Sequence, residues 1–453
     1  KDEARKRRAL AVLESMGAVM PEPDYCIPLR GAGDTAVYVL SRISGEGSDR
    51  KLAAGDVLLT ETEKRDILQL QRQYKRFMLV LNVGGVVDLS PLAAVENILL
   101  LSQLGVETGN ILADLLLGKS SPSGKLTATW SAYKDYQTIG EFGGRDETRY
   151  REGIYVGYRW FDAAGIRPLF PFGHGLSYTS FAQKLLSVHA EGECVTAEVK
   201  VTNTGFRAGR EVVQLYVSSP EGRLDKPVQS LAAFAKTREL QPKESEMLSL
   251  SFRMRELASY DASFAAWVLE KGDYILRIGN SSVLTKPAAI VRLDAEATVM
   301  RAKHCGGTPD FEDWKPARRE AEKLHFVRVL SMSASSIREE NPLYGKTQEV
   351  DSFTNSLSDR ELASLCVGAF EPVIGSLSVI GEASKTVAGA AGETTGRLQG
   401  KGVPTLVMAD GPAGLRLSRE YVRDTKGVHA VGETIPESVS ELLPAPVAWL
   451  MKH

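Results

Sequence analysis

The hydrophobic positions in the first part of the chain fall into short continuous runs separated by longer amphipathic segments. Three runs stand out, at residues 36–40, 77–83 and 97–101. A strand covered on both faces of a parallel sheet needs apolar residues on both sides, so these runs predict buried parallel strands. Strands that alternate with helices predict βαβ units. Residues 1–182 are therefore predicted to form a doubly wound α/β sandwich domain.

Two helices are predicted between and after these strands. Thr60 and Glu63 have the spacing of a capping box. Apolar residues then follow at helical intervals, at Ile67, Leu70, Tyr74 and Phe77. Residues 107–119 (ETGNILADLLLGK) predict a second helix. Gly118 is expected to close it, because glycine readily adopts the left-handed conformation that ends many helices.

From residue 183 to about 296 the pattern changes to alternation of apolar and polar positions. It is clearest at residues 197–205, 211–220 and 272–282, and turn signals separate these segments. Such strands within roughly 100 residues predict a β-sandwich of the immunoglobulin or fibronectin type III kind. The segment 183–296 has no clustered His or Cys and no paired carboxylates. We therefore expect a structural or orienting role for this domain.

The remainder of the chain divides into a connector and a last domain. Residues 297–344 are rich in charge and lack a clear series of strands, which predicts a helical or irregular connector. Residues 345–453 contain a helix-start signal at 358–361 and a predicted parallel strand at Thr405–Met408, which leads to Asp410. The carboxyl end of a parallel strand is a favoured place for ligand chemistry. Asp-Gly-Pro is also one of the commonest turn sequences, so both interpretations stay open.

Composition and charge narrow the class of protein. The 453 residues exceed one ordinary domain core, and 43% hydrophobic with 25% charged residues is typical of soluble globular proteins. A net charge of −2 gives no electrostatic reason to expect nucleic acid or an acidic membrane as a partner. No apolar run reaches the roughly 18 to 20 residues that a membrane span needs. The four cysteines lie far apart without metal-like spacing to the six histidines, so we expect reduced thiols, a cytoplasmic location and no metal site.

The segment after the first apolar run, residues 41–50 (SRISGEGSDR), places charged side chains on a loop flanked by glycines. In open α/β sheets ligands bind just beyond the carboxyl ends of strands, and this loop has such a position. Gly45 and Gly47 allow sharp turns on both sides of Glu46, which would present its carboxylate from a rigid sheet. Loops of this composition are also often solvated turns, and the pattern alone does not decide between the two.

Longer stretches of the chain resemble glycoside hydrolase family 3 β-glucosidases. Four of them resemble the C-terminal half of that family: SRISGEGSDRK, LLSQLGVETGNILADLLLGKSSPSGKLTATW, REGIYVGYRWFD and PFGHGLSYTSF. VTNTGFRAGREVVQLYV resembles its fibronectin type III-like domain, and KGVPTLVMADGPAGLR resembles the start of its (β/α)8 TIM barrel. The resemblance covers nearly the whole chain apart from the connector. The sandwich precedes the barrel motif here, which is similar to the inverted domain order of some members.

The resemblance implies a retaining, exo-acting β-glucosidase that hydrolyses terminal non-reducing β-D-glucosyl residues of glucosides or oligosaccharides and needs no cofactor. It assigns Glu46 as the general acid/base, Asp410 as the residue that binds hydroxyls of the sugar in the −1 subsite, and Arg416 as a support of that pocket. Asp49 and Arg50 are expected to order the loop that carries Glu46. Related activities in the family, β-xylosidase and α-L-arabinofuranosidase, are alternatives.

The family nucleophile is an Asp in a Ser-Asp-Trp motif, which this sequence lacks. Residues 345–453 number 109, whereas a (β/α)8 barrel typically needs about 250. We therefore expect only the first part of a barrel here, the nucleophile on a part outside this sequence, and a second chain or segment that completes the barrel. A homo-oligomer is a further expected partner. The alternative function is a non-catalytic carbohydrate-binding or scaffold protein.

Overall fold

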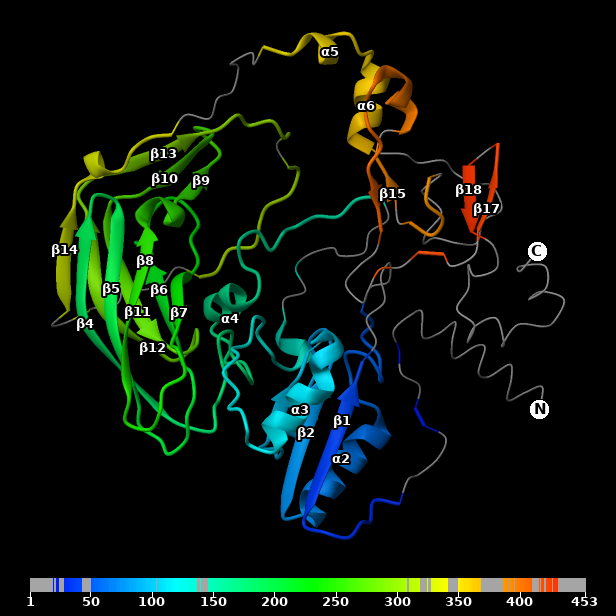
Figure 1. Cartoon of the computed structure of the whole chain (residues 1–453). Helices are drawn as coiled ribbons and strands as arrows, with labels where there is room; N and C mark the ends of the chain where they lie inside the picture. Colours follow the sequence, from blue (N-terminus) through cyan, green and yellow to red (C-terminus); the bar gives the residue numbers. More distant parts are fainter. Residues whose placement is uncertain are drawn as a thin grey trace.

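Three regions follow one another along the chain in the computed structural model (Figure 1): an α/β layer, a β-sandwich and a set of short elements after residue 349. The structure describes residues 19, 22–23, 28–42, 50–102, 104–136, 139, 146–307, 309–317, 324, 327–340, 349–367, 386–390, 392–394, 396–409, 415, 417–418, 421–425 and 427–430. Short 3-10 helices interrupt the loops: η1 (Ser90–Leu92), η2 (Gly105–Glu107), η3 (Tyr133–Asp135), η4 (Met254–Leu257), η5 (Ala334–Ser336) and η6 (Gly396–Lys401).

The α/β layer is built on a parallel sheet with the strand order β1-β2-β3. Its strands are β1 (Thr35–Ser41), β2 (Arg76–Asn82) and β3 (Ile98–Leu100), so all three predicted strands are confirmed. Helix α2 (Glu61–Gln73) connects β1 to β2, and α3 (Thr108–Leu116) follows β3. The predicted alternation of strands and helices is therefore present.

The start of α2 is the predicted capping box. The Thr60 hydroxyl accepts a hydrogen bond from the Glu63 backbone N–H (3.1 Å), and the Glu63 carboxylate accepts one from the Thr60 N–H (2.9 Å). At the C-terminal end of α2 the predicted helical spacing extends too far. Tyr74 is extended and caps the helix, and Phe77 already belongs to β2. The chain leaves the helix there because Arg76 must pair with the end of β1, its N–H donating to the Asp34 carbonyl (2.9 Å).

The two faces of this sheet are covered unequally. One face packs with α2 in a core that includes Leu40, Leu79 and Leu81, and α3 packs on the other face over β2 and β3. The prediction of strands covered on both faces holds for β2 and is wrong for β1. Val37 and Val39 are 42% and 49% exposed, because β1 is the edge strand and α3 does not reach it.

The β-sandwich consists of a five-stranded sheet, β14-β12-β11-β6-β7, and two three-stranded sheets, β4-β5-β8 and β13-β10-β9, which share one hydrophobic core. This confirms the predicted fibronectin-like sandwich. Its strands in chain order are β4 (Phe181–Glu191), β5 (Cys194–Asn203), β6 (Val212–Ser218), β7 (Ser230–Lys236), β8 (Ser245–Arg253), β9 (Ser259–Asp261), β10 (Ala266–Leu269), β11 (Gly272–Gly279), β12 (Thr285–Leu293), β13 (Ala297–Arg301) and β14 (Arg328–Met332).

Strand β6 departs from the alternation predicted for it, since Val213–Val217 is buried without interruption. The cause is the α/β region, which covers the outer face of β6. The ring of Tyr158 in α4 (Tyr158–Ala164) meets that of Tyr216 at 6.1 Å, and the Gln214 amide donates to the Gly173 carbonyl (3.0 Å). The sandwich and the α/β region therefore share a packed interface.

The expectation of a helical or irregular connector after residue 296 is wrong for two segments. β13 pairs antiparallel with β10, and β14 pairs parallel with β12, so both belong to the sandwich. Met332 and Ile337 are buried in the sandwich core. These strands escape sequence analysis because they are short and flanked by charged residues, and only pairing with strands already in place stabilises them.

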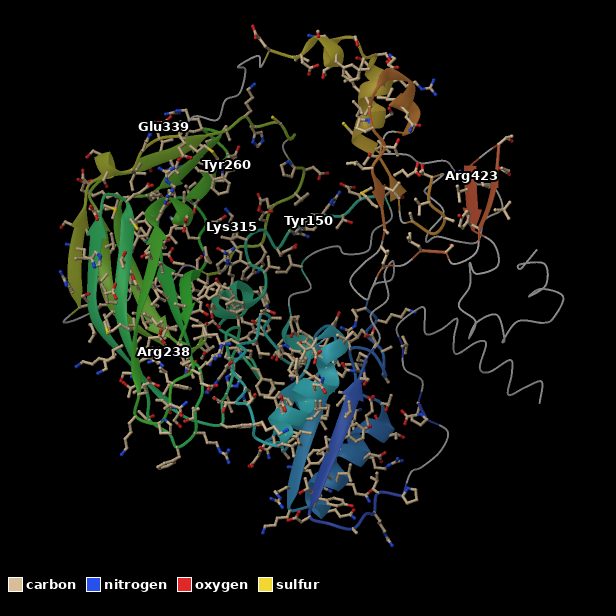
Figure 2. All side chains as sticks on the ribbon, in the orientation of Figure 1. Tyr150, Arg238, Tyr260, Lys315, Glu339 and Arg423 are labelled. Carbon is tan, nitrogen blue, oxygen red and sulfur yellow. The ribbon has the colours of Figure 1, made fainter. Side chains whose placement is uncertain are left out.

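Between β13 and β14 the chain crosses to the α/β region as an arm, residues 309–317. The Trp314 N–H donates to the Arg151 carbonyl (2.6 Å), and the Trp314 ring contacts those of Tyr155 (5.2 Å) and Trp160 (4.8 Å). Lys315 pairs with Asp225 (3.3 Å), which ties the arm back to the sandwich. Lys315 is labelled in Figure 2. The arm thus fixes the loop before α4.

After residue 349 the elements are short. They are α5 (Ser352–Asn355), α6 (Asp359–Val367), β15 (Gly392–Glu393), β16 (Val407–Met408), β17 (Tyr421–Asp424) and β18 (Gly427–Ala430). The predicted start of α6 is confirmed, since the Glu361 carboxylate accepts from the Ser358 N–H (2.9 Å). The predicted parallel strand at Thr405–Met408 is wrong. A strand forms only at β16, and it pairs antiparallel with β15, with Gly392 opposite Met408 and Glu393 opposite Val407.

Two further features concern the chain as a whole. None of the helices in the described part combines the length and the hydropathy needed to cross a membrane. Cys194, Cys305 and Cys366 are free thiols, and Cys26 lies outside the described residues.

We predict that Trp314→Ala loosens the loop before α4. Losing a half-buried indole should lower the free energy of local opening by about 2 kcal/mol, less than the cost at a fully buried site, and raise the open population about thirtyfold. Limited digestion with trypsin should then cut faster after Arg149 and Arg151. Trp267→Ala is the matched control, since Trp267 contacts Tyr260 of the sandwich. Equal cleavage rates in both variants would contradict the role of the arm.

Candidate active site

The three residues predicted to form the site, Glu46, Asp410 and Arg416, lie outside the described residues. Asp49 lies outside them as well. The structure does describe both ends of the segment that carries Glu46, at Arg42 and Arg50. What the structure reveals about the site is therefore the geometry of these two ends.

Arg42 follows β1 directly, and its side chain is fully buried. Its guanidinium forms two parallel hydrogen bonds with the Glu63 carboxylate, at 2.7 and 2.8 Å. Its Nε donates to the Asp56 carbonyl (2.7 Å), and further bonds reach the carbonyls of Ser41 and Leu58. A bidentate, charge-assisted pair with additional carbonyl acceptors satisfies nearly every donor of the guanidinium, so this end of the segment has one well-defined position.

Arg50 holds the other end. Its Nε donates to the carboxylate of Asp56, which is 0% exposed, and its guanidinium also donates to the Val86 carbonyl (3.1 Å). The backbone N–H of Lys51 donates to the second oxygen of the same carboxylate. These contacts fix Arg50 at the end of the segment; that Arg50 orders the loop stays a prediction, because residues 43–49 lie outside the described residues.

Asp56 connects the two ends. Its carboxylate binds Arg50 and Lys51, while its backbone carbonyl accepts from Arg42. A buried carboxylate is costly unless it is paired and hydrogen-bonded, and here both oxygens have donors. Residues 42 and 50 are thereby held to one another through a single buried residue. The two described ends of the segment that contains Glu46 therefore have fixed positions relative to each other.

Sequence analysis did not identify Arg42, Asp56 or the second role of Glu63. Glu63 was read only as a capping residue, whereas its carboxylate serves the helix start and Arg42 together. Gly85 also has a role that the sequence did not show. A Cβ atom at this position would lie 2.6 Å from the Arg50 Nη1, so any other residue here would require the Arg50 guanidinium to move. A weak signal was available, because each end of the segment carries an Arg.

The carboxyl edge of the sheet carries a further sign of constraint at Ser102. This residue follows β3 and has a φ of 56°, a left-handed conformation that is uncommon outside glycine. Such backbone conformations cluster at ligand sites, where the surrounding structure holds them. Ser102 and Arg42 follow parallel strands at the same edge, which is where open α/β sheets bind ligands.

Tyr38 lies on β1 near the Arg42–Glu63 pair. Burial, followed by the charges of Glu63 and Asp66, raises the pKa of Tyr38 to about 12. Its hydroxyl therefore stays neutral at ordinary pH, and the charge of this region resides on the arginines and carboxylates alone.

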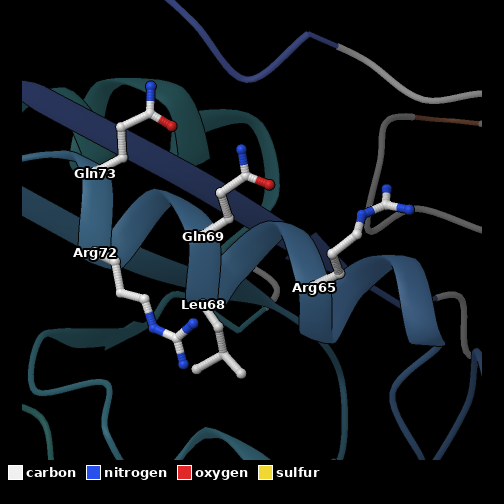
Figure 3. Close-up of a pocket in the computed structure, with 5 residues that line it drawn as sticks. All are labelled: Arg65, Leu68, Gln69, Arg72 and Gln73. Carbon is white, nitrogen blue, oxygen red and sulfur yellow. The ribbon is translucent and has the colours of Figure 1, made fainter.

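Other candidate places are less suited to catalysis. An open hollow lies along α2, lined by Arg65, Leu68, Gln69, Arg72 and Gln73, all from one helix (Figure 3). None of these side chains is a nucleophile or a carboxylic acid. Within the part of the chain that the structure describes, no group of three or more His, Cys, Asp and Glu side chains could hold a metal ion.

The fold and the anchored ends of the charged segment define a multidomain protein in which an α/β domain is followed by a fibronectin-like sandwich. Residues 28–178 match the family model of the glycosyl hydrolase family 3 C-terminal domain, and residues 211–282 match that of the fibronectin type III-like domain. The chain therefore carries the C-terminal domain of glycoside hydrolase family 3. Both matches agree with the positions of the α/β layer and the sandwich.

Curated relatives extend this similarity over most of the chain. It is 32% identical over 418 residues to a β-glucosidase of Ruminococcus albus, covering 85% of this chain and 43% of that protein. It is 37% identical over 311 residues to β-glucosidase A of Butyrivibrio fibrisolvens, covering 58% of this chain and 37% of that protein. The chain thus spans less than half the length of these relatives.

Solved structures give the same picture. A β-glucosidase from Paenibacillus barengoltzii aligns with a TM-score of 0.69 and 30% identity, covering 91% of this chain and 48% of its own. β-Glucosidase 3B from Thermotoga neapolitana, in complex with α-D-glucose, aligns with a TM-score of 0.56 and 42% identity, covering 59% and 38%. An alignment over 91% of this chain is longer than residues 1–344. The alignment with the Paenibacillus barengoltzii enzyme therefore continues into the last domain. This is consistent with the barrel segment expected there.

We predict that Asp56→Asn destabilises the α/β domain. The variant loses the charge paired with Arg50, and the free energy of unfolding should fall by about 2 kcal/mol. This is below the full cost of breaking a buried pair, because the Arg50 side chain is 28% exposed. Urea unfolding measures the change.

Asp34→Asn is the matched control for this prediction. Asp34 pairs with Arg76 in the same domain, but both side chains are more than half exposed, so little change is expected. Equal stability of the two variants would contradict the role of Asp56 as the connecting residue.

Proposed function

We propose that this protein is part of a retaining, exo-acting β-glucosidase that releases terminal β-D-glucosyl residues from glucosides or oligosaccharides. The similarity to β-glucosidases over most of the chain supports this activity. The observation that carries the site assignment is the buried Arg42–Asp56–Arg50 network, which holds both ends of the segment that contains Glu46. A catalytic acid needs such support, because misplacement by about 1 Å can cost a hundredfold in rate.

In the proposed mechanism Glu46 protonates the glycosidic oxygen as the bond to the aglycone breaks. The same carboxylate then removes a proton from the water that hydrolyses the glycosyl-enzyme intermediate. Asp410 accepts hydrogen bonds from hydroxyls of the bound sugar, and Arg416 supports that pocket. Bonds of this charge-assisted kind contribute to catalysis when they tighten in the transition state.

The nucleophilic carboxylate is proposed to lie on a part of the barrel outside this sequence, because no Ser-Asp-Trp motif occurs in it. The proposed partner is therefore a second chain or segment that completes the barrel. A homo-oligomer is a further possibility for the assembled protein. The absence of that motif is also what favours the second candidate, a non-catalytic carbohydrate-binding protein. β-Xylosidase and α-L-arabinofuranosidase activities stay as alternatives for the substrate.

We predict that Glu46→Gln lowers the turnover of an aryl β-glucoside by about a hundredfold or more in the full-length protein, because general acid/base catalysis contributes this much. With a good leaving group, the step that is slowed in Glu46→Gln should be hydrolysis of the glycosyl-enzyme intermediate. Added azide needs no general base, so it should restore turnover and yield the β-glucosyl azide.

Asp49→Asn is the matched control, since it removes a carboxylate from the same segment and keeps the proposed acid/base; because Asp49 is expected to order the loop, a smaller loss that azide does not restore is expected. Turnover that is unchanged in Glu46→Gln, or equally reduced in both variants, would contradict the assignment of Glu46. Absence of turnover in the unmodified full-length protein would favour the non-catalytic alternative.

We also predict that the purified active material contains more polypeptide than these 453 residues. Denaturing intact-mass spectrometry, run beside the aryl glucoside assay, should reveal a further polypeptide or a longer chain. A single species with the mass of this sequence and full turnover would show that the nucleophile lies within it.

A further inference from the structure

Three ring side chains lie together on the outer face of the small sheet β13-β10-β9. Tyr260 on β9 stands directly opposite Trp267 on β10, with ring centroids 5.5 Å apart. His304, just after β13, lies 6.3 Å from Tyr260. Tyr260 is labelled at the margin of the sandwich in Figure 2. We call Tyr260, Trp267 and His304 the aromatic platform.

The core of the sandwich does not need these rings. Along β10 the neighbours of Trp267, Ala266 and Val268, are buried, so Trp267 points to the opposite face and is 39% exposed. The outer face of an antiparallel sheet next to water normally carries polar side chains. Adjacent rings on such a face form a local apolar surface that a ligand can contact.

The platform is held in place before any ligand arrives. The pairing of β9 with β10 fixes Tyr260 and Trp267 side by side, and the Tyr260 hydroxyl is hydrogen-bonded to the His304 Nδ1 (3.2 Å). The Tyr260 and His304 rings are within 10° of parallel. This bond uses Nδ1, which leaves Nε2 as the nitrogen able to meet a ligand. Binding to an ordered surface loses little conformational entropy.

We propose that the aromatic platform binds a β-linked glucan chain. In a β-linked glucose unit all ring substituents are equatorial, so each unit presents flat C–H faces that stack on aromatic rings. Its hydroxyls lie around the edge, where His304 and the indole N–H of Trp267 can meet them. No carboxylate or cation belongs to the platform, which suits a neutral ligand. The choice of a β-glucan rests on the proposed function, whereas the stacking does not.

The platform lies in the sandwich, while Glu46 lies in the α/β domain and Asp410 in the last domain. A bound chain would keep the protein near a polymeric substrate without contributing to the reaction itself. The platform should therefore affect binding of a polymer and leave the turnover of a small aryl glucoside unchanged.

Native gel electrophoresis of the full-length protein in gels that contain soluble β-1,3-1,4-glucan tests this proposal. The unmodified protein should be retarded as the glucan concentration rises. The double variant Tyr260→Ala/Trp267→Ala should bind at least about tenfold more weakly, because it removes both rings on which the sugar faces would stack. Phe206→Ala is the matched control, because Phe206 is a 97% exposed ring of the same sandwich outside the platform.

Two milder variants guard against misfolding of the double variant. Trp267→Phe keeps a ring and should keep most of the retardation, while His304→Ala, an exposed position, should lose part of it. The proposal is overturned if the unmodified protein is not retarded, or if all variants are retarded equally. It is also overturned in favour of a protein interface if glucan has no effect while Trp267→Ala shifts the size-exclusion volume. Gel retardation does not depend on turnover, so failure of the proposed hydrolase activity would be seen separately.

Discussion

The buried carboxylate of Asp56 is the constraint on which the proposed active site depends. It lies between two arginines that bracket a glycine-containing segment, and it binds one through its side chain and the other through its backbone carbonyl. Glu63 completes the arrangement, because the same carboxylate that closes the first turn of α2 also binds Arg42. The helix start, the end of β1 and both ends of the segment are thus one hydrogen-bonded unit, and a change at any member is expected to reach the others.

The sandwich adds a second level of support to the α/β domain. Its strand β6 is buried on both faces because Tyr158 and the residues around Gly173 pack on it. The arm that carries Trp314 leaves the sandwich, contacts the loop before α4 and returns. An orienting module needs this kind of double attachment, since an interface that is packed at two places resists relative rotation of the domains.

The similarity to glycoside hydrolase family 3 relates the hydrogen-bonded unit around Asp56 and the domain interface to one proposed function. In the proposed mechanism the acid/base belongs to the α/β domain and the sugar-binding residues to the last domain, so catalysis requires domains that hold fixed positions. The chain spans less than half the length of its curated relatives, and the remaining barrel is proposed to supply the nucleophile. The aromatic platform would then serve substrate capture rather than chemistry.

The sequence by itself determined the elements whose signals are local. Continuous apolar runs identified β1, β2 and β3, the Thr60–Glu63 spacing identified the start of α2, and alternation identified β5 and β11. Tertiary structure alone decided what depends on distant partners. The exposed face of β1, the continuous burial of β6 and the short strands β13 and β14 follow from which surfaces meet. Arg42 and Asp56 are fourteen positions apart, and they are in contact only because the fold brings Asp56 next to the residue that follows β1. The local sequence encodes the periodicity of apolar residues and the helix caps. Burial and ion pairing depend on residues that only the folded structure brings together.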